Sequence, residues 1–307
     1  MTSWIDAHKA GSPTDPNVFW LHYRAKEIGE RFKESTGYKV SNGLIKRKLR
    51  SLGFGYRKLS KNLATGSCPE RDTQFKVIFR FMLFMRLNCP VISIDCKKKE
   101  VLGKLYRQGK SYQHGQVEVY DHDYSYLATG KVIPHGIYDL KRNEGYITIG
   151  TSHETAAFIA DNLRWWWTDY GINQYPVAKN IIIFCDAGGG NSYRHHIFKK
   201  KILELADEIG KNIIICHYPP YSSKWNPIEH RLFCHVHQAM QGIVLDSYQT
   251  VKLLIDKTTT KAGLKVISRI VEKEYDIGEK IKPEDVEYHR INPNPTLPKF
   301  SYMVKPK

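Results

Sequence analysis

The sequence has few features of a secreted, membrane-spanning or zinc-binding protein. It contains six cysteines in 307 residues and no CxxC pair, which argues against both disulfides and a zinc site. No apolar run approaches the roughly 20 residues that a membrane-spanning helix needs. Residues 1–16 lack the basic and then apolar layout of a secretory signal. We therefore expect a cytoplasmic or nucleoid-associated protein.

Acidic residues are also scarce. Asp and Glu number 31 against 47 Lys and Arg, which gives a formal net charge of +16. A chain this basic favours a polyanionic partner, and nucleic acid is the usual one. The excess is concentrated near the N-terminus, because residues 39–61 hold eight basic residues and no acid.

Residues 1–70 are expected to form a basic helical region. Residues 24–36 have helical apolar spacing, and Ser41 can cap a second helix at residues 42–52. The side chains expected to face inward from this second helix are Leu44, Ile45 and Leu49. Two short helices around a tight turn are typical of a helix-turn-helix, although a solvated basic face on an ordinary helix is the alternative. The candidate DNA-binding side chains are Lys46, Arg47, Lys48, Arg50, Arg57 and Lys58.

The rest of the chain is expected to be an α/β domain with two flanking segments. Residues 71–89 are apolar enough to predict a mostly buried linking helix. Strands are predicted at residues 90–98, 131–140, 145–152, 180–186 and 212–219, with helices at 153–171 and 192–210. Three mainly antiparallel strands followed by alternating helices and strands predict a mixed sheet flanked by helices, over residues 90–277. The proline-rich residues 278–307 are expected to form an extended, loosely packed tail.

Asp95 and Asp186 each interrupt or end an apolar strand. An unpaired carboxylate buried in a strand such as "VISIDCKKKE" costs several kcal/mol, so a positive group must lie beside Asp95. The run Lys97 to Lys99 and a divalent metal ion are equal candidates for that group. Asp186 precedes three glycines and either starts a simple turn or, if the two strands are neighbours, meets Asp95.

Glu229 follows "PPYSSKWNP" at the start of a predicted helix. Asn226 as cap, Pro227 at the first helical position and Glu229 three residues after the cap form a capping-box pattern, which would explain the glutamate without chemistry. The two roles are compatible. If Glu229 joins the two aspartates, three carboxylates share one patch and repel one another unless a cation lies between them.

Oxygen ligands of this kind suit Mg²⁺ or Mn²⁺. Two such ions roughly 4 Å apart can clamp an in-line phosphoryl transfer. On a chain of charge +16, the expected phosphodiester is DNA.

Three segments carry a family resemblance. "SIDCKKKE", "IIFCDAGGGNSYR" and "HYPPYSSKWNPIEHRLF" resemble the DDE transposases of bacterial insertion sequences, most closely the Rhodopirellula-type DDE transposase family, and "PPYSSKWNPIE" is also similar to the equivalent segment of mariner-like transposases. The resemblance runs from about residue 20 to about residue 300. Family members are expected to carry a longer N-terminal region, so a truncated copy is one expectation.

The resemblance implies a ribonuclease H-like catalytic domain that uses two Mg²⁺ ions, for which Mn²⁺ can substitute. It places the metal-binding catalytic acids at Asp95, Asp186 and Glu229. The implied reaction is cleavage at the ends of the element to free a 3′-OH, followed by attack of that hydroxyl on target DNA. Paired element ends imply a homodimer or higher oligomer on DNA.

Two other functions remain open. One is a catalytically silent DNA-binding protein derived from a transposase, against which the presence of all three acids argues. The other is a structure-selective DNA nuclease without strand transfer, which would use the same site.

Several residues near Glu229 are further candidates. Lys224 and Trp225 precede its helix and are possible DNA contacts, and His230 is a possible site neighbour. The scattered histidines do not have spacings suited to zinc. Packing is favoured over base stacking for the run Trp165 to Trp167, since three consecutive helical residues point in three directions.

Overall fold

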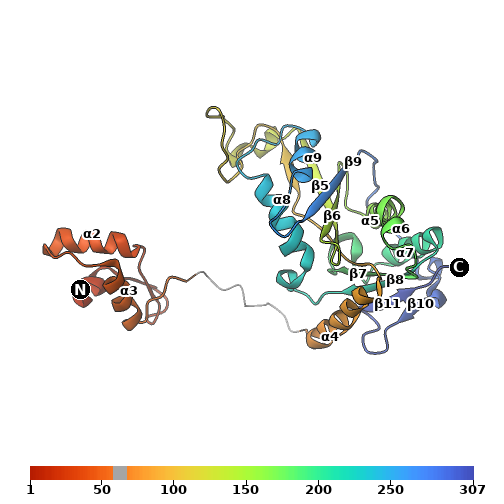
Figure 1. The fold of residues 1–307 in the computed structure, drawn as a ribbon, viewed down its shortest axis with the longest axis horizontal. Helices are drawn as coiled ribbons and strands as arrows, with labels where there is room; N and C mark the ends of the chain where they lie inside the picture. The colour runs from red at the N-terminus through yellow and green to blue at the C-terminus, as the bar shows by residue number, and fades with distance from the viewer. Residues whose placement is uncertain (58–67) are drawn as a thin grey trace. The chain divides into compact units, whose positions relative to one another are not determined.

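The chain divides into two compact units, Met1–Thr65 and Gly66–Lys307. This computed structural model describes residues 1–57 and 68–307 (Figure 1). The first unit is helical, and the second is built on a large sheet. Within the described ranges, no helix has both the length and the apolar character needed to cross a membrane.

Residues 1–57, the described part of the first unit, form three helices and a short pair of strands. These elements are α1 (Thr2–His8), β1 (Ala10–Gly11), β2 (Phe19–Trp20), α2 (Ala25–Thr36) and α3 (Asn42–Ser51). The predicted helix pair corresponds to α2 and α3. α2 ends at Gly37, whose φ of 78° is the left-handed conformation that favours glycine. The Ser41 hydroxyl caps α3 by accepting a hydrogen bond from the Leu44 amide at 3.3 Å.

The outer surface of α3 carries most of the predicted cations. Ile45 is fully buried against α2, but Leu44, which was expected to face inward, is 47% exposed. α3 packs on α2, and Ile45 is its one buried residue, so a narrow stripe of it is covered. Five of the six predicted DNA-binding residues are exposed or partly exposed: Lys46, Arg47, Lys48, Arg50 and Arg57. Lys58 lies outside the described residues, and DNA binding by all six stays a prediction.

The second unit is built on one large mixed sheet. Its strands are β3 (Val91–Cys96), β4 (Glu100–Leu102), β5 (Gly130–Asp139), β6 (Glu144–Gly150), β7 (Asn180–Cys185), β8 (Asn212–His217), β9 (Lys265–Val271), β10 (Ile291–Pro293) and β11 (Ser301–Val304). The order across the sheet is β10-β11-β8-β7-β3-β5-β6-β9, and β4 pairs with β5. The five strands predicted from the sequence are β3, β5, β6, β7 and β8.

The centre of this sheet has the arrangement expected of a ribonuclease H-like fold. β3, β5 and β6 form an antiparallel meander. β7 pairs in parallel with β3 on its other side, and β8 pairs in parallel with β7. The predicted fold class, a mixed sheet of this type flanked by helices, is therefore confirmed.

The C-terminal residues differ from the loosely packed tail that was expected. β11 pairs antiparallel with β8, and β10 pairs with β11, so these residues extend the sheet at one edge. Tyr302 and Val304 are 3% and 0% exposed. The prolines suggested an irregular segment, but they lie mostly between and around the two short strands, where they do not interrupt the pairing.

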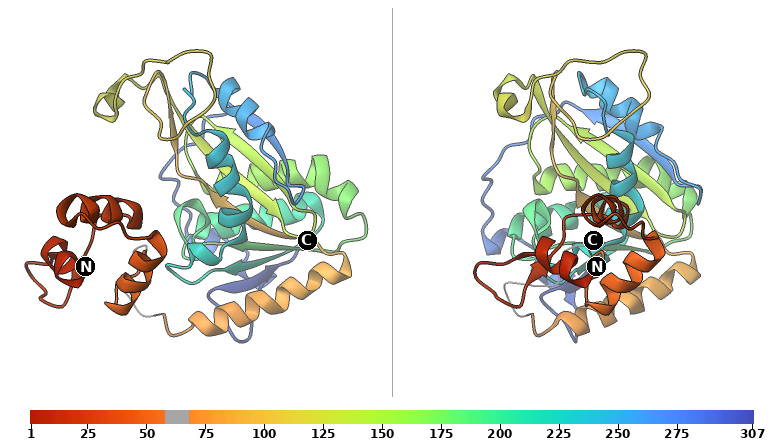
Figure 2. Two further views of the ribbon diagram at one scale, coloured as in Figure 1. Left: turned by 60° about the vertical axis from the view of Figure 1, so that its left-hand side comes forward. Right: turned by 90° about the vertical axis from the view of Figure 1, so that its left-hand side faces the viewer.

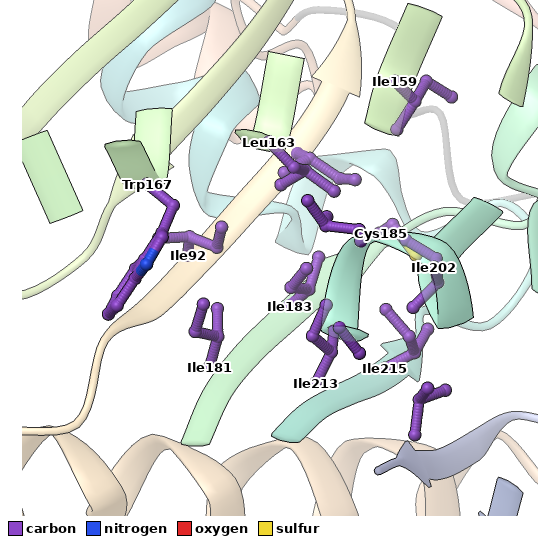
Figure 3. Packing of buried hydrophobic residues seen from close by; sticks show 14 of the residues in the cluster. Ile92, Ile159, Leu163, Trp167, Ile181, Ile183, Cys185, Ile202, Ile213 and Ile215 are labelled. Atoms are coloured by element: carbon purple, nitrogen blue, oxygen red, sulfur yellow. The ribbon is translucent and has the colours of Figure 1, made fainter. Parts of the chain in front are cut away.

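Helices cover both faces of the sheet (Figures 1 and 2). The helices of this unit are α4 (Arg71–Met82), α5 (Ala156–Trp166), α6 (Ile172–Gln174), α7 (His196–Ile209), α8 (Cys234–Ala239) and α9 (Tyr248–Asp256). α5 and α7 pack on one face, where isoleucines of β3, β7 and β8 meet Leu163 and Ile202 in a single cluster (Figure 3). α4, α8 and α9 cover the other face through two further clusters.

Two predictions about apolar segments had different outcomes. Trp166 and Trp167 are 0% and 3% exposed, which confirms that they serve packing. The linking helix, expected to be mostly buried, is not: Phe79, Leu83 and Leu87 are 60%, 56% and 73% exposed. α4 lies on the surface of the sheet, so only one of its sides is covered.

Candidate active site

Asp95 and Asp186 lie at the same end of two neighbouring parallel strands. In the pairing of β3 with β7, Ser93 is opposite Phe184. Asp95 follows Ser93 by two residues and Asp186 follows Phe184 by two, so both acids emerge on adjacent backbones and on one face of the sheet. The alternate residues of β3 belong to the apolar cluster beneath α5 and α7. The strand period thus directs Ser93 and Asp95 away from that cluster.

Glu229 comes close to this end of the sheet because two glycines lie under its helix. It begins η6 (Glu229–Phe233), a π-helical turn that leads into α8. Gly136 is opposite Asp95 in the sheet register, and a Cβ on it would be 2.6 Å from a phenylalanine ring carbon of η6. A Cβ on Gly145 would be 2.4 Å from a leucine methyl of η6. Larger residues at either position would push η6 away from the sheet.

The electrostatics indicate that the three acids are near one another. The pKa of Asp95 is raised to about 8. Burial is the largest cause, and the nearby charges of Asp186 and Glu229 add to it. Burial also raises the pKa of Glu229, while His230 and Lys97 act to lower it and Asp186 to raise it. Two neighbouring acids therefore oppose the ionisation of Asp95.

Asp95 is held by hydrogen bonds to neutral groups. Its Oδ2 accepts from the Asn226 side-chain amide at 3.0 Å, and its Oδ1 accepts from the Cys96 backbone N–H at 2.8 Å. The lysine run considered above takes a different partner, because Lys97 is buried in an ion pair with Glu100. Within residues 1–57 and 68–307, no ion pair to Asp95 is formed. A lysine is therefore not the positive group beside Asp95.

Asn226 does not act as the predicted helix cap. Its side-chain oxygen accepts a hydrogen bond from the Ser93 hydroxyl at 2.5 Å, while its amide N–H donates to Asp95. The helical segment begins at Pro227, and the two polar atoms of the Asn226 side chain bond Ser93 and Asp95 of β3 instead of the backbone of that segment. The capping-box explanation of Glu229 therefore fails, and the Glu229 carboxyl is left for other contacts.

A cavity of about 360 Å³ opens beside the two aspartates. Its walls include Asp95, Asp186, Asn226 and Arg194. Among the described residues that line it, Arg194 is the one Lys or Arg, and its guanidinium lies over the Tyr193 ring, 5.2 Å from the centroid. A cation and two carboxylates thus line one cavity, and a guanidinium can bind an anionic group.

The glycines after Asp186 give the backbone room at this cavity. The Gly188 N–H donates to the Asp186 carboxylate at 3.2 Å. Gly189 has φ of 54°, and a Cβ on it would be 2.7 Å from the Glu154 carboxylate. The glycine run thus allows a turn between two acidic side chains.

Glu154 is a fourth acid at this edge that the sequence analysis missed. Burial raises its pKa, the Cys96 thiol and Lys99 act to lower it, and Asp186 raises it. It also lines a second cavity of about 550 Å³, which shares Arg194 with the first. The signal available in the sequence was the "HET" that starts a predicted helix, but an acid near a helix N-terminus has a common structural role.

The remaining candidates near Glu229 are exposed. Trp225 is 59% exposed and contacts Phe75 edge to face, with ring centroids 6.1 Å apart. The Lys224 ammonium lies over the Trp225 ring, 5.4 Å from the centroid. Neither residue lines the two cavities. His230 is exposed beside Glu229.

In the parts of the chain that the structure describes, no three His, Cys, Asp or Glu side chains are already gathered tightly enough to hold a metal ion. Asp95, Asp186 and Glu229 are therefore near neighbours and not a closed ligand set.

A comparison with solved structures finds similarity to mariner transposase. The chain is similar to a Mos1 transposase paired-end complex with left transposon end, with 15% identity and a TM-score of 0.47, covering 81% of this chain and 72% of that chain. The chain is also similar to a Mos1 mariner paired-end complex with Mg, with 15% identity and a TM-score of 0.47, covering 81% of this chain and 75% of that chain. For the catalytic domain of Mos1 mariner transposase, the identity is 12% and the TM-score 0.41, covering 66% of this chain and 84% of that chain. A comparison with curated protein sequences finds no match.

A family model covers nearly the whole chain. It is described as the Rhodopirellula transposase DDE domain, and it matches residues 1–306. The match includes the first 20 residues, which the resemblance noted in the sequence had left out. The chain therefore belongs to the Rhodopirellula-type family of DDE transposases.

Proposed function

We propose that this transposase cleaves DNA at the ends of an insertion sequence and transfers the freed 3′-OH into target DNA, with Asp95, Asp186 and Glu229 as its catalytic, metal-binding acids. The observation that supports this most is the effect of the other two carboxylates on Asp95. The three acids come from β3, from the end of β7 and from η6, yet Asp186 and Glu229 both raise the pKa of Asp95. Acids from distant parts of a chain that meet in one place, against the cost of repulsion, are typical of functional sites.

The residues present fit Mg²⁺ or Mn²⁺ by their chemistry. All three are carboxylates, the donors that these hard cations prefer. Asp95 is mostly buried and has no ion-pair partner among the described residues, so a bound cation would offset the cost of its charge. The proposal requires the carboxylates to draw together around the metal, because they are not yet a closed set.

Two bound divalent ions would activate the attacking oxygen and stabilise the leaving oxygen. The protein's own groups orient the reactants around them. Asn226 and the Cys96 N–H fix the Asp95 carboxylate, and His230 favours ionised Glu229 by lowering its pKa. Arg194, which lines the same cavity as the two aspartates, would bind a phosphate oxygen of the DNA strand.

Binding to DNA is assigned to the basic N-terminal region, residues 1–70. α3 would be the recognition helix, and its Lys and Arg side chains would contact phosphates and bases. Residues 71–89 would link this region to the catalytic domain, residues 90–277. Lys224 and Trp225 are exposed near Glu229 and would contact DNA close to the cut. Two element ends must be processed together, so the active form would be a dimer or higher oligomer. It would act on DNA in the cytoplasm, at the nucleoid.

The test uses purified protein, Mn²⁺ and labelled DNA carrying the sequences that flank its own coding region. We expect cut products and then joined products. Asp186→Asn should reduce cleavage at least about 1,000-fold, since a metal ligand is lost, and should leave DNA binding within about twofold. Asp169→Asn is the matched control, because Asp169 is exposed on the turn after α5.

Three results would contradict parts of this proposal. Normal cutting by Asp186→Asn would remove that residue from the site. Cutting without joined products would favour a nuclease, and binding without any cutting would favour a silent DNA-binding protein.

A further inference from the structure

We propose that Asn226 is a positioning residue that fixes the Asp95 carboxylate for metal binding, and that Ser93 in turn fixes Asn226. This inference rests on the proposed metal-binding role of Asp95 and adds to it two residues that the acid triad does not include.

The three side chains form a chain of hydrogen bonds in the interior. The Ser93 hydroxyl donates to the Asn226 side-chain oxygen at 2.5 Å, and the Asn226 amide N–H donates to Asp95 Oδ2 at 3.0 Å. Ser93 is 0% exposed and Asn226 is 2% exposed. Water therefore does not compete for the Ser93–Asn226 bond, while the Asn226–Asp95 bond is part-buried at the wall of the cavity.

Ser93 determines which end of the Asn226 amide meets Asp95. A side-chain amide has one accepting and one donating end, and the two are nearly equal in shape. Because the oxygen is occupied by the Ser93 hydroxyl, the NH₂ group is the end that faces the carboxylate. The reverse orientation would set the amide oxygen against a carboxylate oxygen.

The result for Asp95 is a carboxylate with one protein donor on each oxygen. Asn226 binds Oδ2, and the Cys96 backbone N–H binds Oδ1 at 2.8 Å. Each carboxylate oxygen can accept at least one further interaction, so both remain able to bind a cation. The rotation of the carboxylate, however, is set by the two donors. Groups of this kind orient metal ligands in many sites.

The position of Asn226 supports a functional reason for this contact. Asn before Pro227 at a helix start is a favoured cap, and a local cap would stabilise the helix. The Asn226 side chain instead reaches across to β3, where its oxygen bonds Ser93 and its amide N–H bonds Asp95. When a side chain at a candidate site gives up its favoured local contact for a distant one, a functional role is expected.

The test measures Mn²⁺ binding to the full-length protein by titration calorimetry, without DNA. We expect the Mn²⁺ dissociation constant to rise about 10- to 100-fold in Asn226→Ala, and several-fold in Ser93→Ala. The double variant should bind no more weakly than Asn226→Ala, because both residues act through one contact. Asn162→Ala is the matched control: Asn162 is also 0% exposed, but it bonds Arg269 away from the site.

The outcomes separate this inference from the proposed function. Wild-type protein that binds no Mn²⁺ would overturn the metal-binding proposal and this inference with it. Wild-type binding that is unchanged in Asn226→Ala, or lost equally in Asn162→Ala, would overturn this inference alone. Additive effects of the two single changes would remove Ser93 from it. If Asn226→Ala does not fold, as judged by its thermal melt, Ser93→Ala decides: unchanged Mn²⁺ affinity there contradicts the inference.

Discussion

Charge is placed in opposite ways on α3 and at the acidic edge of the sheet. The cations of α3 lie on an outer surface, and Lys46, Arg47 and Arg50 are exposed. The acids at the sheet edge are largely withdrawn from water, and burial is the largest cause of the raised pKa of Asp95. Water and salt screen the first group, while the second group is coupled through the protein.

This difference predicts different responses to mutation. Exposed cations each contribute a small and nearly independent amount to the binding of a polyanion. Buried acids depend on one another, so a change to one alters the charge state of the others. Three predictions test this contrast, from the largest expected effect to the smallest.

The largest effect concerns the pH dependence of stability. The folded protein raises the pKa of Asp95 from its ordinary 3.8 to about 8, so the folded state binds this proton more tightly than the unfolded state does. The resulting stabilisation is fully present below about pH 4 and is lost as the pH rises through about 8. In metal-free buffer, the free energy of unfolding should fall over this range by a few kcal/mol more in the wild type than in Asp95→Asn.

Chemical denaturation at several pH values measures this difference, and Mn²⁺ at pH 8 should restore stability to the wild type more than to Asp95→Asn. Parallel pH profiles for the two proteins would mean that the pKa of Asp95 is not raised in the folded protein. That result would contradict the contrast between the coupled acids and the independent cations of α3.

The second prediction compares two glycines. Gly145→Ala should lower the free energy of unfolding by about 1–3 kcal/mol and reduce cleavage, because the new methyl would collide with η6 and displace Glu229. Gly43→Ala in α3 should instead stabilise by about 0.5–1 kcal/mol, since its Cβ would meet no atom closer than 4.0 Å. Thermal melts of both variants check this pair, and equal effects would show that η6 tolerates a wider separation from the sheet.

The smallest effect is expected on α3. Arg47→Ala should weaken binding of DNA by less than about tenfold at moderate salt. It should also reduce the slope of log affinity against log salt by about 1, the amount expected for the loss of one phosphate contact. Lys26→Ala serves as control, because Lys26 is exposed on α2 instead of α3 and lies beside Glu30 of the same helix. Anisotropy titrations at several salt concentrations measure both slopes. An unchanged slope for Arg47→Ala would place the DNA elsewhere.

The sequence predicted the centre of the sheet but not its edges. The apolar runs at β3, β7 and β8 are long enough to identify buried strands, and the strands predicted at residues 131–140 and 145–152 correspond to β5 and β6, which pair antiparallel. β9 and β11 lie at or near the edges, where half-exposed residues and nearby prolines weaken the pattern. The surface position of α4 was missed because an apolar composition does not tell which neighbours are present.

For the candidate site, the acids could be predicted and their surroundings could not. Asp95 and Asp186 stood out because an acid is unusual in or just after an apolar strand. Asn226 was interpreted as a cap because its local sequence fits one, and Glu154 was passed over for a similar reason. The contacts of Asn226 join residues more than a hundred positions apart, and Glu154 lies beside Cys96 and Gly189, which lie at or after the ends of other strands.

The sequence by itself determined the basic character of the N-terminal region, the strands at the centre of the sheet and the identity of the three acids. These follow from composition and from the periodicity of a strand or helix, which are local. The tertiary structure alone decided that Ser93 and Asn226 hold Asp95, that η6 approaches the sheet over two glycines, and that Lys97 pairs with Glu100. Those results depend on which side chains meet across the fold, and only the packing of the whole domain specifies that.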